Sequence, residues 1–129
     1  MTLNVKAQKR NKGHPVLHVT GRLDAEAVPV CEAAIRPWLQ PSTQVLILNL
    51  SGLEYICSLG LRMLMQTRQA LAARHARLLM TNLQPQILRV FELAAMLSKT
   101  EVFDSVESAD IFLEALENKI RLTDSDVDD

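Results

Sequence analysis

The four consecutive aliphatic residues at positions 45–48 constrain the fold of this chain more than any other segment. Short unbroken apolar runs are typical of strands that are covered on both faces, as in sheets with parallel pairs. Beyond this run comes Ser58, after which apolar residues recur at helical spacing. The sequence therefore predicts a buried strand over residues 44–50, a loop, and a helix that runs from Ser58 to about Arg74, with Ser58 as its N-cap.

Strands and helices alternate along the rest of the chain. Two strands, at residues 3–9 and 15–20, are predicted around a turn at residues 11–13. The later predicted elements are a helix with Pro29 in its first turn that ends near Leu39, a strand at 77–81, a short helix opened by Pro85, a strand near 102–103, and a last helix capped by Ser105. This alternation favours a small α/β domain with a mixed four- or five-stranded sheet and helices packed mainly on one face.

Length and composition limit the kind of protein this is. A chain of 129 residues is long enough for one core. We expect one domain over residues 1–121 and a disordered tail over 122–129, where acidic residues dominate. The net charge of −1 gives no reason to expect nucleic-acid binding. No apolar run approaches the roughly 20 residues of a membrane-spanning helix, and no signal peptide is recognisable, so we expect a cytoplasmic protein without membrane insertion.

No catalytic motif stands out. The four glycines are spread singly, which excludes a glycine-rich phosphate loop, and Ser58 lacks the flanking glycines of a nucleophile elbow. His14 and His18 could share one face of a strand, but no further metal ligands accompany them. Cys31 and Cys57 form no disulfide or metal motif, and we expect both to be small core-type residues. The sequence predicts no enzyme, no cofactor and no metal site.

Ser58 has two interpretations on local chemistry alone. A serine that precedes a helix commonly caps it, which stabilises the helix by about 1 kcal/mol. The start of a helix also favours negative charge, because backbone N–H groups and the helix dipole point there. A phosphate attached to Ser58 would be tolerated for that reason. Local chemistry does not decide between a cap and a phosphorylation site.

Five short motifs between about residues 3 and 117 have a characteristic order and spacing. They are Gly21-Arg22-Leu23-Asp24, Asn49-Leu50-Ser51, Tyr55-Ile56-Cys57-Ser58-Leu59-Gly60-Leu61, Asn82-Leu83 with Pro85, and Phe103-Asp104-Ser105. Together they resemble the STAS domain family, in its anti-sigma factor antagonist type. When the family pattern is aligned on Gly60-Leu61, its phosphorylated serine falls on Ser58. The chain departs from the pattern at Cys57, where the family often has Asp or Ser, and at Leu59, where it has Ser or Ala.

The resemblance implies bacterial transcription regulation by partner switching. An unphosphorylated antagonist binds an anti-sigma factor that is also a serine kinase of the histidine-kinase-like ATPase type, and the sigma factor is released. Phosphorylation separates the pair, and a serine phosphatase restores the first state. We therefore expect phosphorylation at Ser58 and partner binding through Asp24, Glu54, Tyr55, Cys57, Ser58, Leu59 and Leu61. The alternative that the family offers is a non-enzymatic subunit of an ABC-type lipid transport system.

Overall fold

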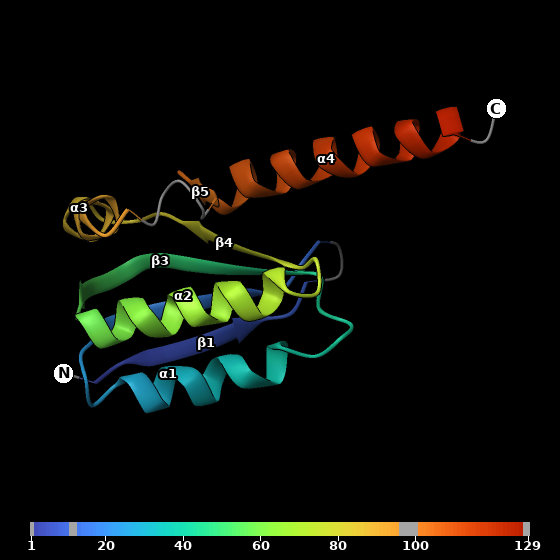
Figure 1. Cartoon of the computed structure of the whole chain (residues 1–129). Coiled ribbons are helices and arrows are strands. Elements are labelled where there is room, and N and C mark those ends of the chain that lie inside the picture. The colour runs from blue at the N-terminus through green and yellow to red at the C-terminus, as the bar shows by residue number, and fades with distance from the viewer. Residues whose placement is uncertain (1, 11–12, 96–100, 128–129) are drawn as a thin grey trace.

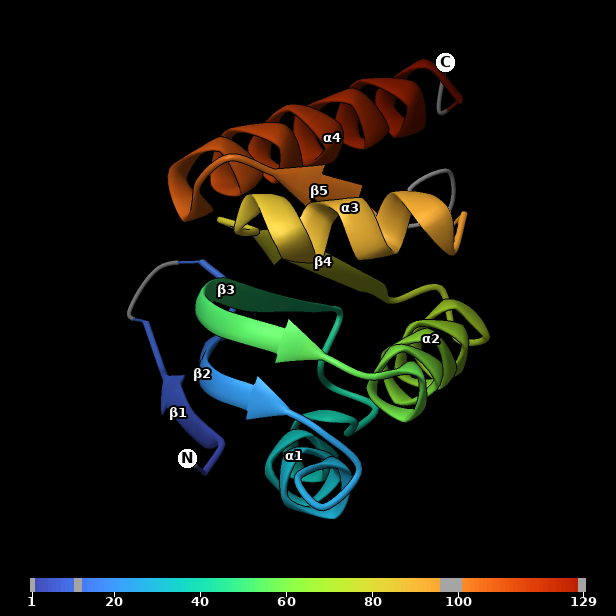
Figure 2. The same ribbon diagram turned by 90° about the vertical axis from the view of Figure 1, so that its left-hand side faces the viewer.

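A five-stranded mixed sheet organises the chain (Figures 1 and 2). The computed structural model describes residues 2–10, 13–95 and 101–127, with side chains for residues 2–10, 13–95 and 102–119. The strands lie in the order β1 (Asn4–Gln8), β2 (Val16–Leu23), β3 (Val45–Ile56), β4 (Arg77–Thr81) and β5 (Glu101–Phe103). The pair β1–β2 is antiparallel and the other pairs are parallel. This confirms the predicted mixed sheet.

The helices are distributed unequally over the two faces of the sheet. The larger core receives side chains from α1 (Val28–Ile35), α2 (Ser58–Ala72) and α3 (Pro85–Leu93), whereas α4 (Val106–Val127) covers a smaller core on the other face (Figure 2). The prediction of helices packed mainly on one face is therefore confirmed, with α4 as the exception. As the sequence predicted, Pro29 lies in the first turn of α1. The chain tightens into the 3-10 helix Arg36–Trp38 at Pro37, because a proline removes a backbone donor.

The apolar run at residues 45–48 belongs to both cores. Leu46 and Leu48 point into the larger core, while Val45 and Ile47 point into the core beneath α4. Successive side chains of a strand point to opposite faces, so a strand that is covered on both sides has to be apolar at every position. The predicted buried strand is confirmed.

β3 is longer than the sequence predicted, because it continues to Ile56 through residues that we expected in a loop. The pairing of β3 with β4 ends where Asn49 lies opposite Thr81. Its pairing with β2 continues to Ile56, which lies opposite Leu23. The prediction that Glu54 and Tyr55 lie in flanking loops is therefore wrong, since both are strand residues.

Two glutamines at the start of α3 bond to the edge of β3 that β4 leaves open. The side-chain amide of Gln84 donates a hydrogen bond of 2.7 Å to the carbonyl oxygen of Ser51. The amide of Gln86 donates one of 3.2 Å to the carbonyl oxygen of Glu54. These bonds satisfy backbone acceptors in place of a neighbouring strand, and they act together with the pairing to β2 on the other side of the segment.

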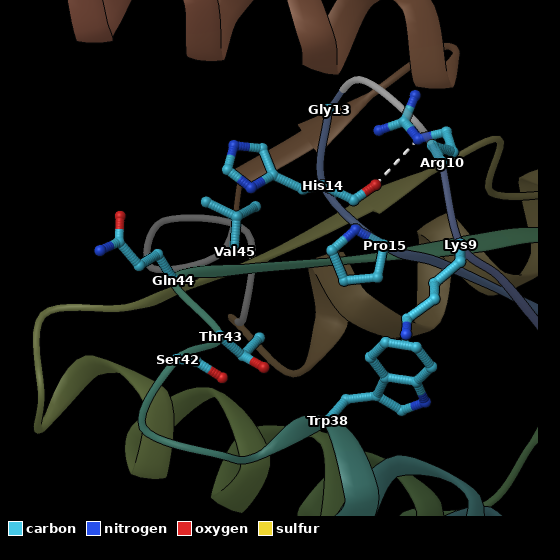
Figure 3. A pocket seen from close by; sticks show the side chains of 10 residues that line it. All are labelled: Lys9, Arg10, Gly13, His14, Pro15, Trp38, Ser42, Thr43, Gln44 and Val45. Carbon is cyan, nitrogen blue, oxygen red and sulfur yellow. Dashed lines mark hydrogen bonds between the residues drawn. The ribbon is translucent and has the colours of Figure 1, made fainter.

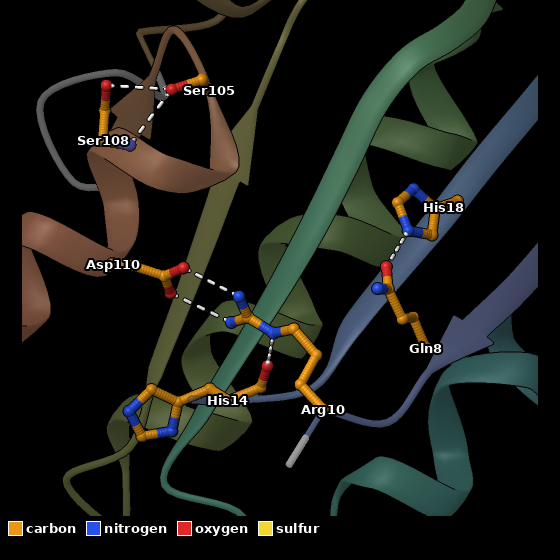
Figure 4. Close-up of polar contacts among 7 residues, drawn as sticks. All are labelled: Gln8, Arg10, His14, His18, Ser105, Ser108 and Asp110. Atoms are coloured by element: carbon orange, nitrogen blue, oxygen red, sulfur yellow. Dashed lines mark hydrogen bonds and ion pairs between the residues drawn. The ribbon is translucent and has the colours of Figure 1, made fainter. Parts of the chain in front are cut away.

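Side-chain bonds define both the start of α4 and its attachment to the sheet (Figure 4). The backbone N–H of Ser108 donates to Ser105 Oγ over 3.1 Å, which confirms Ser105 as the predicted cap. The Arg10 guanidinium makes two bonds, of 2.7 and 3.0 Å, with the carboxylate of Asp110. A bidentate pair of this kind is geometrically specific, so it holds the segment just after β1 against α4.

The last residues of α4 overlap the tail that the sequence predicts at residues 122–129. The helix continues to Val127 and therefore includes residues 122–127. Residues 128–129 lie outside the described residues. The domain boundary at residue 121 stays a prediction.

The two cysteines have different environments. Cys31 is buried in the larger core, as predicted, and burial together with the neighbouring Glu32 carboxylate raises the pKa of its thiol from 9.0 to about 12. Cys57 is only half-buried, so the prediction of a core position is wrong for this residue. The reason is its place at the end of β3, where the chain leaves the sheet.

Cys57 alone is expected to react with a thiol reagent in the folded protein. The raised pKa lowers the thiolate fraction of Cys31 by about a thousandfold at neutral pH, and the thiolate is the reactive form. Labelling with Ellman's reagent at pH 8 should give one fast equivalent, and a second one only on addition of denaturant. The Cys57→Ser variant should lose the fast equivalent. Two fast equivalents in the native protein would contradict this assignment.

Gly60 sets how closely α2 approaches the sheet. A Cβ atom at this position would lie 2.8 Å from Leu23 Cγ and 3.0 Å from Ile56 Cγ1. Both neighbours are buried at the ends of their strands, so they have little room to move. A residue without a side chain is therefore needed where the start of α2 meets the ends of β2 and β3.

Gly60→Ala is expected to lower the free energy of unfolding. Overpacking costs about 1–3 kcal/mol, and the gain of about 1 kcal/mol that alanine brings to a helix over glycine offsets only part of it, which leaves a net loss of up to about 2 kcal/mol. Gln66→Ala, at an exposed position of the same helix, is the matched control and should change stability little. Urea denaturation followed by circular dichroism measures both. A Gly60→Ala variant more stable than wild type would show that the contact is not tight.

Candidate functional site

The loops that follow β2 and β3 meet at one edge of the sheet (Figure 2). Leu23 and Ile56 are paired at the ends of the two strands, and the N–H of Cys57 donates a hydrogen bond of 3.0 Å to the carbonyl oxygen of Leu23. Asp24 and Ser58 come next along the chain and therefore lie at the same edge. The carboxyl ends of parallel strands are the usual position of binding sites in α/β proteins.

Ser58 is the first residue of α2, and its side chain is exposed. The N-cap is Cys57, with φ −94° and ψ 173°, and no side chain of the described residues caps the helix. The prediction that Ser58 is the N-cap is therefore wrong by one residue, because the bond from Cys57 to Leu23 keeps Cys57 extended. Within the described part of the chain, the Ser58 hydroxyl has no hydrogen-bond partner.

The first turn of α2 lacks negative charge. It has no acidic residue, and the whole helix carries Arg62 and Arg68 but no Asp or Glu. The first N–H groups of a helix have no acceptor within it, and they form the positive end of the helix dipole. The start of α2 itself therefore favours an added anion.

Apolar side chains lie exposed beside Ser58. Leu59, the next residue of α2, is 47% exposed, and Tyr55 at the end of β3 is 39% exposed. Leu61 is half-buried and packs against the larger core, so only part of its side chain is accessible. Leu59 and Tyr55 are therefore the largely exposed apolar side chains around Ser58.

The side chains of Asp24 and Glu54 have different surroundings. The Asp24 carboxylate accepts a hydrogen bond of 3.0 Å from the N–H of Ala27, and its carbonyl accepts two more from the residues that open α1. Asp24 therefore shapes the turn before α1. The Glu54 side chain is exposed on β3.

Arg22 belongs to this edge and was missed by the sequence analysis. It pairs with Tyr55 across β2 and β3, and its guanidinium lies 4.3 Å from the centre of the Tyr55 ring. This is a favourable cation–π distance, so Arg22 and Tyr55 contact one another across the two strands. Its position in the Gly21-Arg22-Leu23-Asp24 motif was the available signal.

A cavity of about 380 Å³ lies at the other end of the parallel strands (Figure 3). Lys9 and His14 from the β1–β2 hairpin line one side, while Trp38 and Thr43 from the segment before β3 line the other. None of the predicted site residues lines it. It is separate from the edge that carries Ser58.

Two further properties concern only the part of the chain that the structure describes. There, no group of three His, Cys, Asp or Glu side chains is placed to hold a metal ion. None of the helices in those ranges has both the length and the apolar composition to cross a membrane.

Comparison with known proteins gives consistent matches. Residues 5–109 match the STAS domain. The anti-sigma-B factor antagonist of Staphylococcus aureus (strain NCTC 8325) is 29% identical over 107 residues, which cover 83% of this chain and 98% of that protein.

Solved structures share the fold. The anti-sigma factor antagonist from Mycobacterium paratuberculosis has a TM-score of 0.75 at 22% identity, covering 84% of this chain and 91% of that one. Unphosphorylated SpoIIAA, an anti-sigma factor antagonist, has a TM-score of 0.73 at 19% identity, covering 87% and 97%. The phosphorylated form of SpoIIAA from Bacillus has a TM-score of 0.65 at 21% identity, covering 82% and 96%.

The match to the family extends from β1 into α4 and includes the edge of the sheet that carries Ser58. The strand order, the helices on both faces and the start of α2 at the end of β3 all lie inside it. The chain therefore belongs to the STAS domain family.

Proposed function

We propose that this protein is an anti-sigma factor antagonist that acts by partner switching at Ser58. In its unphosphorylated form it binds an anti-sigma factor that is also a serine kinase of the histidine-kinase-like ATPase type. Phosphorylation of Ser58 separates the two proteins, and a serine phosphatase restores the binding form. In this role the protein works in the cytoplasm as a regulator and not as an enzyme.

The observation that carries the proposal is the state of Ser58. Its side chain is exposed, and its hydroxyl is unengaged within the described residues, at a helix start with no acid in the first turn. The name of the Staphylococcus aureus relative supports the antagonist role, and SpoIIAA, which shares this fold, has been solved in a phosphorylated form. A serine in this state needs no local unfolding to receive a phosphate.

A phosphate on Ser58 would change binding more than folding. It adds a charge of about −1.5 to −2, which the start of α2 can accommodate. The same charge would lie on the partner-facing surface, beside the exposed side chain of Leu59. Placing like charges or an unpaired anion in an interface costs several kcal/mol, so the affinity should fall by a factor of about 100 or more.

The docking surface that we propose is centred on Cys57, Ser58, Leu59 and Leu61. Leu59 supplies its main apolar contact, because its side chain is 47% exposed whereas Cys57 and Leu61 are half-buried. Asp24, Glu54 and Tyr55 flank this centre, and Asp24 acts through the turn that it stabilises.

Incubation with the kinase and ATP should place phosphate on Ser58. Mass spectrometry after proteolysis identifies the modified residue, and Ser58→Ala should remain unmodified while still binding the kinase. Ser51→Ala, which removes another exposed serine of the same segment, should be phosphorylated like wild type. Isothermal titration calorimetry should show at least a hundredfold weaker binding of the phosphorylated protein.

An unmodified Ser58, together with unchanged regulation by Ser58→Ala, would contradict partner switching. That result would favour the lipid-transport alternative, in which no kinase acts on the protein. Copurification with the subunits of an ABC-type transporter would then be the decisive measurement.

Leu59→Asp is expected to weaken binding of the unphosphorylated protein to the anti-sigma factor. Because Leu59 is 47% exposed, an interface can bury about half of it, which contributes about half of the 1.5–3 kcal/mol of a full burial. An unpaired carboxylate in the interface costs more, so Kd should rise about tenfold or more. Ile111→Asp is the matched control, because Ile111 is 67% exposed on α4, over the opposite face of the sheet. Both variants should keep the melting temperature of wild type. Equal effects of the two substitutions on Kd would show that Leu59 is not at the interface.

A further inference from the structure

Arg62 is an exposed arginine, one helical turn beyond Ser58 on α2. It takes part in no ion pair or hydrogen bond with the described part of the chain. No acidic side chain on α2 is available to it, since the helix contains no Asp or Glu. Its positive charge on this helix therefore remains uncompensated by α2 itself.

The geometry of a helix brings Arg62 and Ser58 together. Residues four apart are neighbours on the helix surface, about 6 Å apart along the axis and about 40° apart around it. Side chains on a helix are tilted toward its N-terminus, so the side chain of Arg62 is long enough to reach a phosphate on Ser58. An anion four residues before a cation is also the more favourable order for such a pair.

We propose that Arg62 is the internal binding partner of the phosphate on Ser58. This inference rests on the proposed phosphorylation of Ser58 and specifies how the phosphorylated state is held. The guanidinium would bind two phosphate oxygens in its fork geometry, while the N–H groups of the first turn of α2 face the same anion. Arg62 is thus a positioning residue for the modified serine.

Other charged groups near this edge are less well placed. Arg22 is held over the Tyr55 ring at 4.3 Å. Arg68 lies ten residues from Ser58, about 15 Å further along the helix axis. The carboxylates of Asp24 and Glu54 would repel a phosphate, and the former is bonded to the N–H of Ala27. The i, i+4 position of Arg62 distinguishes it from all four.

The pairing has a consequence for the docking surface. In the unphosphorylated protein, Arg62 presents a positive charge on the exposed side of α2, three residues from Leu59. When the phosphate binds the guanidinium, the positive charge of Arg62 is neutralised and its N–H donors are occupied. Phosphorylation then changes two features of the surface at once, because a negative group appears and a positive one is withdrawn.

A thermodynamic cycle tests the pairing without any kinase. Genetic encoding of phosphoserine at position 58 gives the modified protein directly, in the wild-type and Arg62→Gln backgrounds. Urea denaturation should show that phosphorylation stabilises the wild-type background more than the Arg62→Gln background, by about threefold or more in the unfolding equilibrium constant. Arg68→Gln is the matched control, since it removes the same charge from the same helix, and it should give no coupling.

Phosphorus NMR supplies a second readout, which a purely structural role of Arg62 would not move. The second ionisation of a phosphoserine lies near pH 6, and a bound guanidinium favours the dianion. The midpoint of this titration should therefore lie at lower pH in the wild-type background than in Arg62→Gln, with Arg62→Lys between them. Asp24, Glu54 and Arg22 are present in every background, so their influence cancels.

Two results would overturn the proposal. One is an equal effect of phosphorylation on stability in the wild-type and Arg62→Gln backgrounds, and the other is an identical phosphate titration in both. Failure of the proposed function is a separate outcome, because the phosphoserine protein would then bind the anti-sigma factor as tightly as the unmodified one. The coupling to Arg62 can be present in either case.

Discussion

Burial of β3 on both faces is the constraint on which the rest of this structure depends. Leu46 and Leu48 join the core of α1, α2 and α3, while Val45 and Ile47 join the core of α4. Each such side chain stabilises the fold by about 1.5–3 kcal/mol on burial. Because neighbouring residues of β3 belong to different cores, this one strand links the two. Because β3 then continues beyond the end of β4, it also carries the chain to the edge where α2 begins.

The position of Ser58 follows from contacts made by its neighbours. The bond from Cys57 to Leu23 fixes the last extended residue, and Gly60 allows the helix start to lie close against Leu23 and Ile56. Among the residues that the structure describes, the Ser58 side chain bonds to none of those that form this arrangement. The serine can therefore change its chemistry while the residues that position it remain unchanged, which is what a binding switch on a rigid domain requires.

Local sequence patterns predicted the elements that depend on residues close together in the chain. They failed for the elements whose bounds depend on residues far away in the sequence. The apolar run and the Ser105 cap were visible because burial on two faces and N-capping act within a few residues. The extension of β3 was not visible, since it depends on pairing with β2 and on Gln84 and Gln86, about 30 residues further along the chain. The helix begins at Ser58 as predicted, but its N-cap was misplaced by one residue for the same reason. Serine is the better cap by propensity, whereas the bond from Cys57 to Leu23 fixes Cys57 in that position.

The two serines that were expected to cap helices show why one of them suits modification. The Ser105 oxygen accepts the N–H of Ser108, and α4 already carries Glu107 in its first turn, so a phosphate there would break a cap and meet a like charge. The first turn of α2 contains no acid, and no side chain in the described ranges caps this helix. A phosphate on Ser58 would supply the negative charge that this helix start lacks, at the cost of no existing bond. The same sequence signal, a serine before a helix, therefore has opposite meanings at the two positions, and the hydrogen bonds of each hydroxyl distinguish them.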